Sequence, residues 1–130
     1  MTSFDDQNDI NSLTGNVINA AIEVHKHLGP GLLESAYEEC LCRELDIRAI
    51  PYERQRELLI EYKGFKLNCA YRLDMVIEDR LILELKSCES VQPIYEAQLL
   101  TYLKLTGIKV GLLINFNVPV LKEGIKRIAN

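Results

Sequence analysis

The chain has 130 residues, a formal net charge of −4 at pH 7, and 48% hydrophobic and 26% charged residues. These values are ordinary for one soluble globular domain, and no apolar run approaches the roughly 20 residues of a membrane-spanning helix. The first ten residues are acidic and polar, unlike a signal peptide, so we expect a cytoplasmic protein without a membrane segment. The negative charge argues against non-specific, high-affinity binding of nucleic acid. It does not exclude an enzyme that acts on nucleic acid, because metal-binding carboxylates themselves add negative charge.

Helical spacing dominates the N-terminal part of the chain. Residues 1–11 are expected to form a flexible lead-in, and a single domain then spans residues 12–130. Apolar residues recur at three- and four-residue steps from Ser12 to Leu28, which predicts a helix that stops at Gly29-Pro30-Gly31. A second amphipathic helix is expected over Leu32–Leu45.

The rest of the chain is expected to form strands, a third helix and a short final helix. The predicted elements are strands over Tyr52–Tyr62 and Phe65–Ala70 with a turn at Lys63-Gly64, a hairpin within Tyr71–Ser87, a helix from Gln92-Pro93 to Gly107, a strand over Ile108–Asn115 and a helix over Val120–Ile128. The order, ααβββ(β)αβα, predicts a mixed α/β (α+β) fold in which helices flank one mixed sheet.

The hairpin within Tyr71–Ser87 is the most informative stretch. Polar and apolar residues alternate on both sides of the polar tripeptide Glu78-Asp79-Arg80, as in two strands joined by a tight turn. A turn of these three residues places Ile77 opposite Leu81 and fixes the register of the hairpin.

Stepping outward in this register places Asp74 opposite Glu84, with Cβ atoms roughly 5 Å apart, and Lys86 on the same face. Facing carboxylates destabilise a sheet unless a cation lies between them, and Mg²⁺ takes one or two carboxylates together with water and phosphate oxygens. The alternative is a solvated sheet face that carries an ordinary Lys–Glu cross-strand pair.

The cysteines are not expected to bind zinc. The four residues show no C-x-x-C spacing, and the two on the second predicted helix point apart; they are Cys40, Cys42, Cys69 and Cys88. We interpret them as reduced thiols that are buried or incidental.

Asp74, nine intervening residues and then Glu84-Leu85-Lys86 have the form D-x₉-E-x-K. This arrangement on a hairpin, with helices before it and an α-β unit after it, resembles the signature of the PD-(D/E)XK nuclease superfamily. Leu73 stands where the proline of that name would be. Gln98 and Tyr102 on the third predicted helix form a Q-x-x-x-Y pair on one helix face, similar to the RecB-like and lambda-exonuclease-like branch. Without that resemblance they are an exposed glutamine and a half-buried tyrosine of an amphipathic helix.

A second motif, G-x-x-E-x-x-Y, begins at Gly31 and contains Glu34 and Tyr37 at an i, i+3 step. Glu34 is either a carboxylate favoured in the first turn by the helix dipole or an acid beside a metal site. Four stretches resemble the GxxExxY protein family over roughly residues 12–128: Ala21–Tyr37, Tyr71–Asp74, Gln98–Gly107 and Gly111–Asn117.

The GxxExxY resemblance implies a restriction-endonuclease-like core. It also implies a Mg²⁺ or Mn²⁺ site made by Asp74, Glu84, the backbone carbonyl of Leu85 and Glu34. Lys86 would act on the phosphate or the attacking water, and Gln98 and Tyr102 would orient the site and the nucleic acid, DNA in preference to RNA. His25 fits the family pattern, although a packed histidine near a helix end fits equally, and Tyr95 replaces a common histidine.

Two other functions remain open on the sequence. One is a catalytically silent nuclease fold that acts as a binding or scaffold module with a partner protein. The other is a toxin–antitoxin or defence component that needs a partner chain for substrate binding. Assembly into a homo-oligomer also remains open. Metal-dependent stabilisation of the folded protein separates a working site from a silent one.

Overall fold

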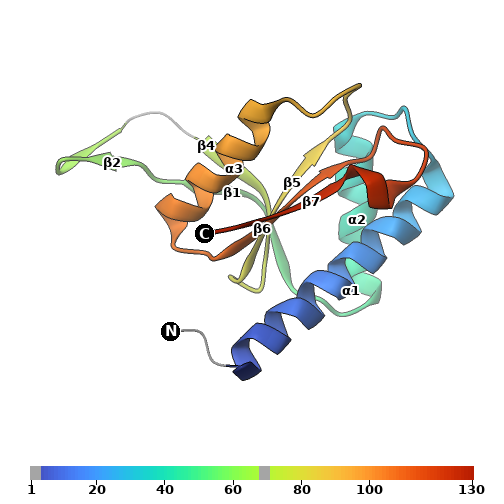
Figure 1. Cartoon of the computed structure of the whole chain (residues 1–130), viewed down its shortest axis with the longest axis horizontal. Coiled ribbons are helices and arrows are strands. Elements are labelled where there is room, and N and C mark those ends of the chain that lie inside the picture. The colour runs from blue at the N-terminus through green and yellow to red at the C-terminus, as the bar shows by residue number, and fades with distance from the viewer. Residues whose placement is uncertain (1–3, 68–70) are drawn as a thin grey trace.

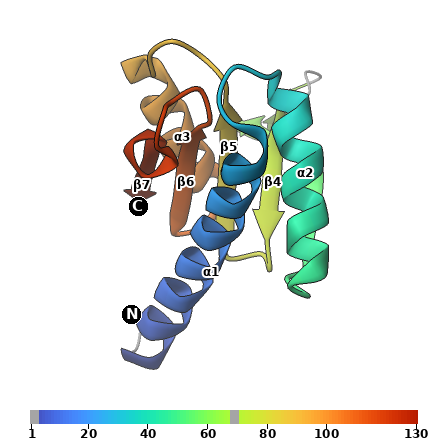
Figure 2. The ribbon, with the colours of Figure 1, turned by 90° about the vertical axis from the view of Figure 1, so that its right-hand side faces the viewer.

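A five-stranded β-sheet lies between two helical layers in the computed structural model, which describes residues 4–67 and 71–130 (Figure 1). Helices α1 (Phe4–Leu28) and α2 (Glu34–Ile47) cover one face, and α3 (Pro93–Thr106) covers the other (Figure 2). The strands, in spatial order, are β1 (Tyr52–Leu58), β4 (Tyr71–Ile77), β5 (Leu81–Lys86), β6 (Val110–Asn115) and β7 (Ile125–Ala129). The expected mixed α/β class is confirmed.

The two central strands, β5 and β6, are buried along almost their whole length because aliphatic side chains fill both faces. They run parallel, and α3 makes the crossover between them. Antiparallel pairing joins β1 to β4, β4 to β5, and β6 to β7. In the β4–β5 hairpin Ile77 pairs with Leu81, so the predicted turn and register are confirmed.

The first helix is longer than the sequence pattern indicates. Residues 4–11, expected as part of a flexible lead-in, are helical and belong to α1. Ile10 is buried in the core between α1, α2 and the sheet, and the Arg127 guanidinium donates to Asn11 Oδ1 (2.9 Å). Core packing at Ile10 and this contact with β7 stabilise helical turns that their acidic, polar sequence would not support alone.

The C-terminal segment forms a strand and not the expected helix over Val120–Ile128. A short 3₁₀ helix, η1 (Leu121–Gly124), leads directly into β7, which pairs with β6. Ile125 packs against the core on the α1/α2 side, and Ile128 packs against the α3 side. A three-residue step between apolar residues fits a helix, but it also fits a strand that contacts a different layer on each face. Pairing also covers the edge that β6 would otherwise expose.

The predicted strand over Tyr52–Tyr62 is divided into β1 and a short strand, β2 (Glu61–Tyr62). β2 pairs with β3 (Phe65–Lys66) across the predicted Lys63-Gly64 turn. β3 is the first part of the second predicted strand, Phe65–Ala70, and residues 68–70 of that strand lie outside the described residues.

Two further expectations concern cysteines and membrane spans. Cys40, Cys42 and Cys88 are free thiols, whereas Cys69 lies outside the described residues. Within the described part of the chain, no helix is long and apolar enough to cross a membrane.

Candidate functional site

The candidate site lies where β4 and β5 separate. Backbone pairing between these strands ends at Met75 opposite Leu83. One residue further along β4, Asp74 Oδ2 accepts the backbone N–H of Leu85 (2.8 Å), and the Asp74 N–H donates a long hydrogen bond to Glu84 Oε1 (3.4 Å). Carboxylates therefore take over as acceptors where the strands diverge, and the predicted convergence of Asp74 and Glu84 is present.

Both acids hold their protons more tightly than ordinary carboxyl groups. Glu84 is only 5% exposed, and burial, followed by the charge of Asp74, raises its pKa to about 9. Burial also raises the pKa of Asp74, although the hydrogen bond from Leu85 opposes this effect. The raised pKa values mean that nearby positive charge does not outweigh the burial of these two carboxyl groups. A bound cation would stabilise their ionised forms.

Lys86 extends from the end of β5 toward the same site. Its charge lowers the pKa of both Asp74 and Glu84, and its Nζ lies 4.5 Å from the centroid of the Tyr95 ring on α3. The backbone N–H of Phe116 donates to the Lys86 carbonyl (2.9 Å). Contacts from β4, α3 and the end of β6 thus position this lysine.

Asn115, which the sequence analysis did not single out, fixes the chain just after Lys86. It is buried at the end of β6, and its Nδ2 donates to the Cys88 carbonyl (3.0 Å) while its Oδ1 accepts the Cys88 N–H (3.1 Å). This double hydrogen bond ties the end of β5 to β6. No local motif reveals it, because the two residues are 27 positions apart.

Helix α2 contributes a wall of the site through residues on one face. A pocket of about 200 Å³ opens here, and its lining consists of Glu34, Ser35, Glu38, Gln55, Asp74 and Leu85. The exposed Glu34 accepts the backbone N–H of Ser87 through Oε1 (3.3 Å) and so connects α2 to the end of β5.

Glu38 is a second acid of this wall that the sequence analysis missed. It is buried, Arg54 donates to its Oε2 from Nη2 (2.8 Å), and Gln55 donates to its Oε1 (2.9 Å). Its charge raises the pKa of Asp74. The i, i+4 step from Glu34 to Glu38 could have revealed this second acid in the sequence, because it places both acids on one helix face.

The Q-x-x-x-Y pair is divided between the interior and the surface. Tyr102 is buried on α3; burial raises its pKa, and the charges of Glu84 and Asp74 raise it further, which places this hydroxyl beside the site. Gln98 is exposed, and its side chain makes no hydrogen bond to any other described residue. The structure therefore brings only Tyr102 close to the carboxylates.

His25 and Tyr37 stabilise the fold next to the site. His25 is buried on α1 with Nε2 between the carbonyls of Phe116 (3.2 Å) and Val118 (2.9 Å), as expected for a packed structural histidine. The Tyr37 hydroxyl donates to the Gly29 carbonyl (2.5 Å), and its ring stacks on Phe116 at 4.4 Å between centroids. The tyrosine of the G-x-x-E-x-x-Y motif thus holds the turn between α1 and α2.

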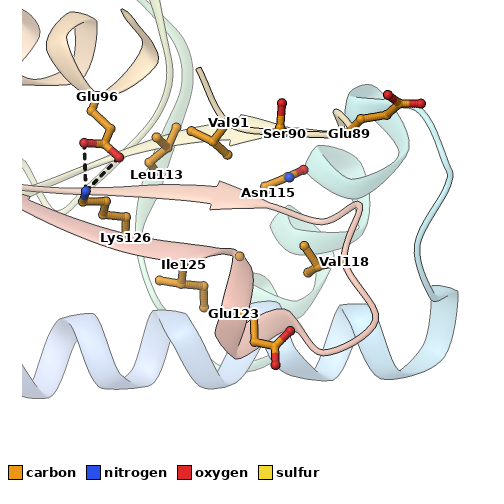
Figure 3. Close-up of a pocket in the computed structure, with 11 residues that line it drawn as sticks. Glu89, Ser90, Val91, Glu96, Leu113, Asn115, Val118, Glu123, Ile125 and Lys126 are labelled. Carbon is orange, nitrogen blue, oxygen red and sulfur yellow. Dashed lines mark hydrogen bonds and ion pairs between the residues drawn. The ribbon is translucent and has the colours of Figure 1, made fainter. Parts of the chain in front are cut away.

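A larger pocket, of about 360 Å³, contains none of the predicted site residues (Figure 3). It lies beside β6, η1 and the start of α3, and the Lys126–Glu96 ion pair (2.8 Å) closes one side. Glu89 and Glu123 extend from its margin. The pocket is therefore separate from Asp74, Glu84 and Lys86, none of which lines it.

The donor set at the β4–β5 fork fits a hard divalent cation such as Mg²⁺ or Mn²⁺. Asp74 and Glu84 supply two carboxylates, and Leu85, whose carbonyl is the predicted third ligand, lines the pocket beside α2 together with Asp74. Such ions accept one or two carboxylates and complete their shells with water and phosphate oxygens. Among the described side chains, no three His, Cys, Asp or Glu residues form a metal-binding group, so Glu34 does not complete a three-acid cluster.

Comparison with known proteins agrees with this geometry. The family model of the PD-(D/E)XK nuclease superfamily matches residues 11–128, which include the fork, α2 and α3. No curated protein and no solved structure gave a significant match. The match covers nearly the whole chain, and the chain belongs to the PD-(D/E)XK nuclease superfamily.

Proposed function

We propose that the protein is a Mg²⁺- or Mn²⁺-dependent nuclease of the GxxExxY type that hydrolyses phosphodiester bonds in DNA in preference to RNA. The observation that carries the proposal is the convergence of Asp74, Glu84 and Lys86 where β4 and β5 separate. Membership of the nuclease superfamily supports the reaction class, and the Q-x-x-x-Y resemblance supports DNA as the substrate.

In this proposal, Asp74, Glu84 and the Leu85 carbonyl hold the ion, and Glu34 assists from the opposite wall of the pocket. A bound divalent cation lowers the pKa of a water molecule and polarises a phosphoryl oxygen. The Lys86 ammonium offsets negative charge that develops on the phosphate.

Helix α3 supports this arrangement in the proposal. Tyr102 fills the space behind the two acids, and Gln98, exposed on the same helix, contacts the nucleic acid.

A silent scaffold with a partner protein is the competing function, and the burial of Glu84 argues against it. A buried carboxyl group with a pKa of about 9 destabilises the folded protein at neutral pH. A scaffold gains nothing from this arrangement, whereas a bound cation would offset the charge of the two carboxylates.

Cleavage of nucleic acid tests the proposal. We expect wild-type protein to cleave DNA in Mg²⁺ or Mn²⁺ but not in EDTA, and Asp74→Ala or Lys86→Ala to lower the rate by at least about 100-fold. Glu123→Ala, at the margin of the larger pocket, serves as the matched control and should keep full activity. Circular dichroism checks that each variant is folded. Cleavage that survives both substitutions at the fork would contradict the proposal.

A further inference from the structure

The short strands β2 and β3 form an arm that extends away from the main sheet (Figure 1). Lys63 (φ 48°) and Gly64 (φ 80°) make a tight turn of the left-handed type that suits a two-residue hairpin. The Leu67 N–H donates to the Ile60 carbonyl (2.9 Å) and continues the ladder toward the sheet. The arm is therefore a defined hairpin, although it has no second layer to bury its side chains.

Two aromatic rings lie exposed side by side on this arm. Tyr62 and Phe65 are directly paired across the strands, so their side chains share one face, and they are 63% and 68% exposed. Large apolar groups gathered in water at one place mark an interaction site more often than isolated ones do. The ring pair is therefore a candidate contact surface for a binding partner.

Two lysines beside the rings indicate the chemical class of this partner. Lys63 Nζ lies 5.4 Å from the centroid of the Tyr62 ring, and Lys66 follows Phe65 directly. Among the described residues, neither lysine forms an ion pair, although Lys66 lies opposite Glu61. Surfaces that bind single-stranded nucleic acid combine aromatic rings, on which bases stack, with ammonium groups, which neutralise phosphates.

The arm also lies at the end of the sheet that carries the candidate site. β4 and β5 are antiparallel, so Tyr71, where β4 leaves the arm, lies at the same end of the sheet as Glu84 and Lys86 on β5. Tyr71 is 43% exposed at this end of β4. A strand that enters the candidate site can therefore continue along Tyr71 toward the arm.

We propose that the β2–β3 arm binds single-stranded nucleic acid by stacking unpaired bases on Tyr62 and Phe65. This inference rests on the proposed nuclease function and specifies its substrate as a strand with unstacked bases. A duplex does not offer such bases, so the arm selects single-stranded segments or frayed ends.

Binding is measured in EDTA, so that it does not depend on cleavage. The chain contains no tryptophan, and Phe65→Trp therefore introduces a single reporter at the arm. We expect a single-stranded oligothymidylate to quench this fluorescence, whereas a blunt duplex and polyglutamate do not. Quenching by polyglutamate, or quenching that rises with protein concentration alone, would overturn the proposal in favour of charge binding or of contact with a second copy.

Fluorescence anisotropy of a labelled oligothymidylate then measures the affinity. The double variant Tyr62→Ala/Phe65→Ala is expected to bind at least tenfold more weakly, because the loss of one stacked base costs about this much or more. Tyr62→Phe keeps a ring and should bind normally. Leu59→Ala is the matched control, because Leu59 is 79% exposed but lies between β1 and β2, outside the paired strands that carry the two rings.

The two proposals fail in different ways. Unchanged affinity of the double variant, or absence of oligothymidylate binding by wild type, overturns the arm proposal. If the protein binds oligothymidylate normally in EDTA but cleaves nucleic acid in no divalent cation, the nuclease proposal is overturned and the arm proposal stands. Circular dichroism and thermal unfolding confirm that the variants are folded.

Discussion

Replacement of Glu84 by glutamine is expected to stabilise the metal-free protein while it abolishes cleavage. Burial and the charge of Asp74 raise the pKa of Glu84 to about 9, so the folded state favours the neutral carboxyl group. Glutamine has the same shape, never ionises, and keeps an oxygen for the Asp74 N–H. In EDTA at pH 8 we expect a gain on the order of 2 kcal/mol in the free energy of unfolding, or about 5–10 °C in Tm.

The gain from Glu84→Gln should depend on pH in a specified direction. Because the pKa of Glu84 is higher in the folded state than its ordinary value of 4.5, the folded state binds more protons than the unfolded state between pH 4.5 and about 9. Stability contributed by the neutral group is therefore fully present below pH 4.5 and is lost as pH rises through this window. The Tm difference between variant and wild type should grow from pH 5 to pH 9.

Thermal unfolding followed by circular dichroism at several pH values measures this difference. Glu123→Gln is the control, because Glu123 is exposed and does not line the pocket at Asp74. A Glu84→Gln variant that unfolds below wild type at pH 8 in EDTA would contradict the interpretation of Glu84 as a buried group with a raised pKa.

Substitutions of Tyr95 are expected to lower cleavage according to what the new side chain offers to Lys86. The Lys86 ammonium lies 4.5 Å from the centroid of the Tyr95 ring, a cation–π contact of about 0.5–2 kcal/mol. Tyr95→Leu should therefore lower kcat by roughly 3- to 30-fold with little change in KM, because Lys86 acts on the transition state. Tyr95→Phe retains the ring face and should retain activity.

Tyr95→His separates positioning of Lys86 from simple packing. A neutral imidazole fills the space, but an imidazolium repels the ammonium, and histidine has an ordinary pKa of about 6.5. The rate of this variant relative to Tyr95→Phe should fall as pH decreases from 8 to 6. The pH–rate profile measures this ratio, and a ratio that does not change with pH would show that Lys86 does not depend on residue 95.

The hairpin that carries the site was predictable because its information is local. Alternation with period two on both sides of Glu78-Asp79-Arg80 fixes the register, and the register brings Asp74 to Glu84. The parallel strands β5 and β6 were also predictable, because continuous aliphatic runs on either side of a helix are typical of a βαβ unit.

The features that sequence reasoning missed depend on contacts between distant segments. The buried Glu38 is recognisable only once Arg54 and Gln55 on β1 lie beside α2. Strand β7 was predicted as a helix, because the spacing of Ile125 and Ile128 fits both structures until the free edge of β6 is known.

The contribution of Tyr95 was missed for the same reason. Its substitution for histidine was visible in the sequence, but its position over Lys86 depends on how α3 packs against the end of β5.

Thermal unfolding of wild type and Asp74→Ala in EDTA, in Mg²⁺ and in Mn²⁺ shows whether Asp74 and Glu84 hold a divalent cation. A ligand that binds only the folded state stabilises it by about 2.7 kcal/mol at 100 times its dissociation constant. We expect metal to raise the Tm of wild type and to leave that of Asp74→Ala unchanged. The rise should be larger at pH 8 than at pH 6, because Glu84 must lose its proton. An equal rise in both proteins, or no rise in wild type at millimolar metal, would contradict a metal site at Asp74 and Glu84.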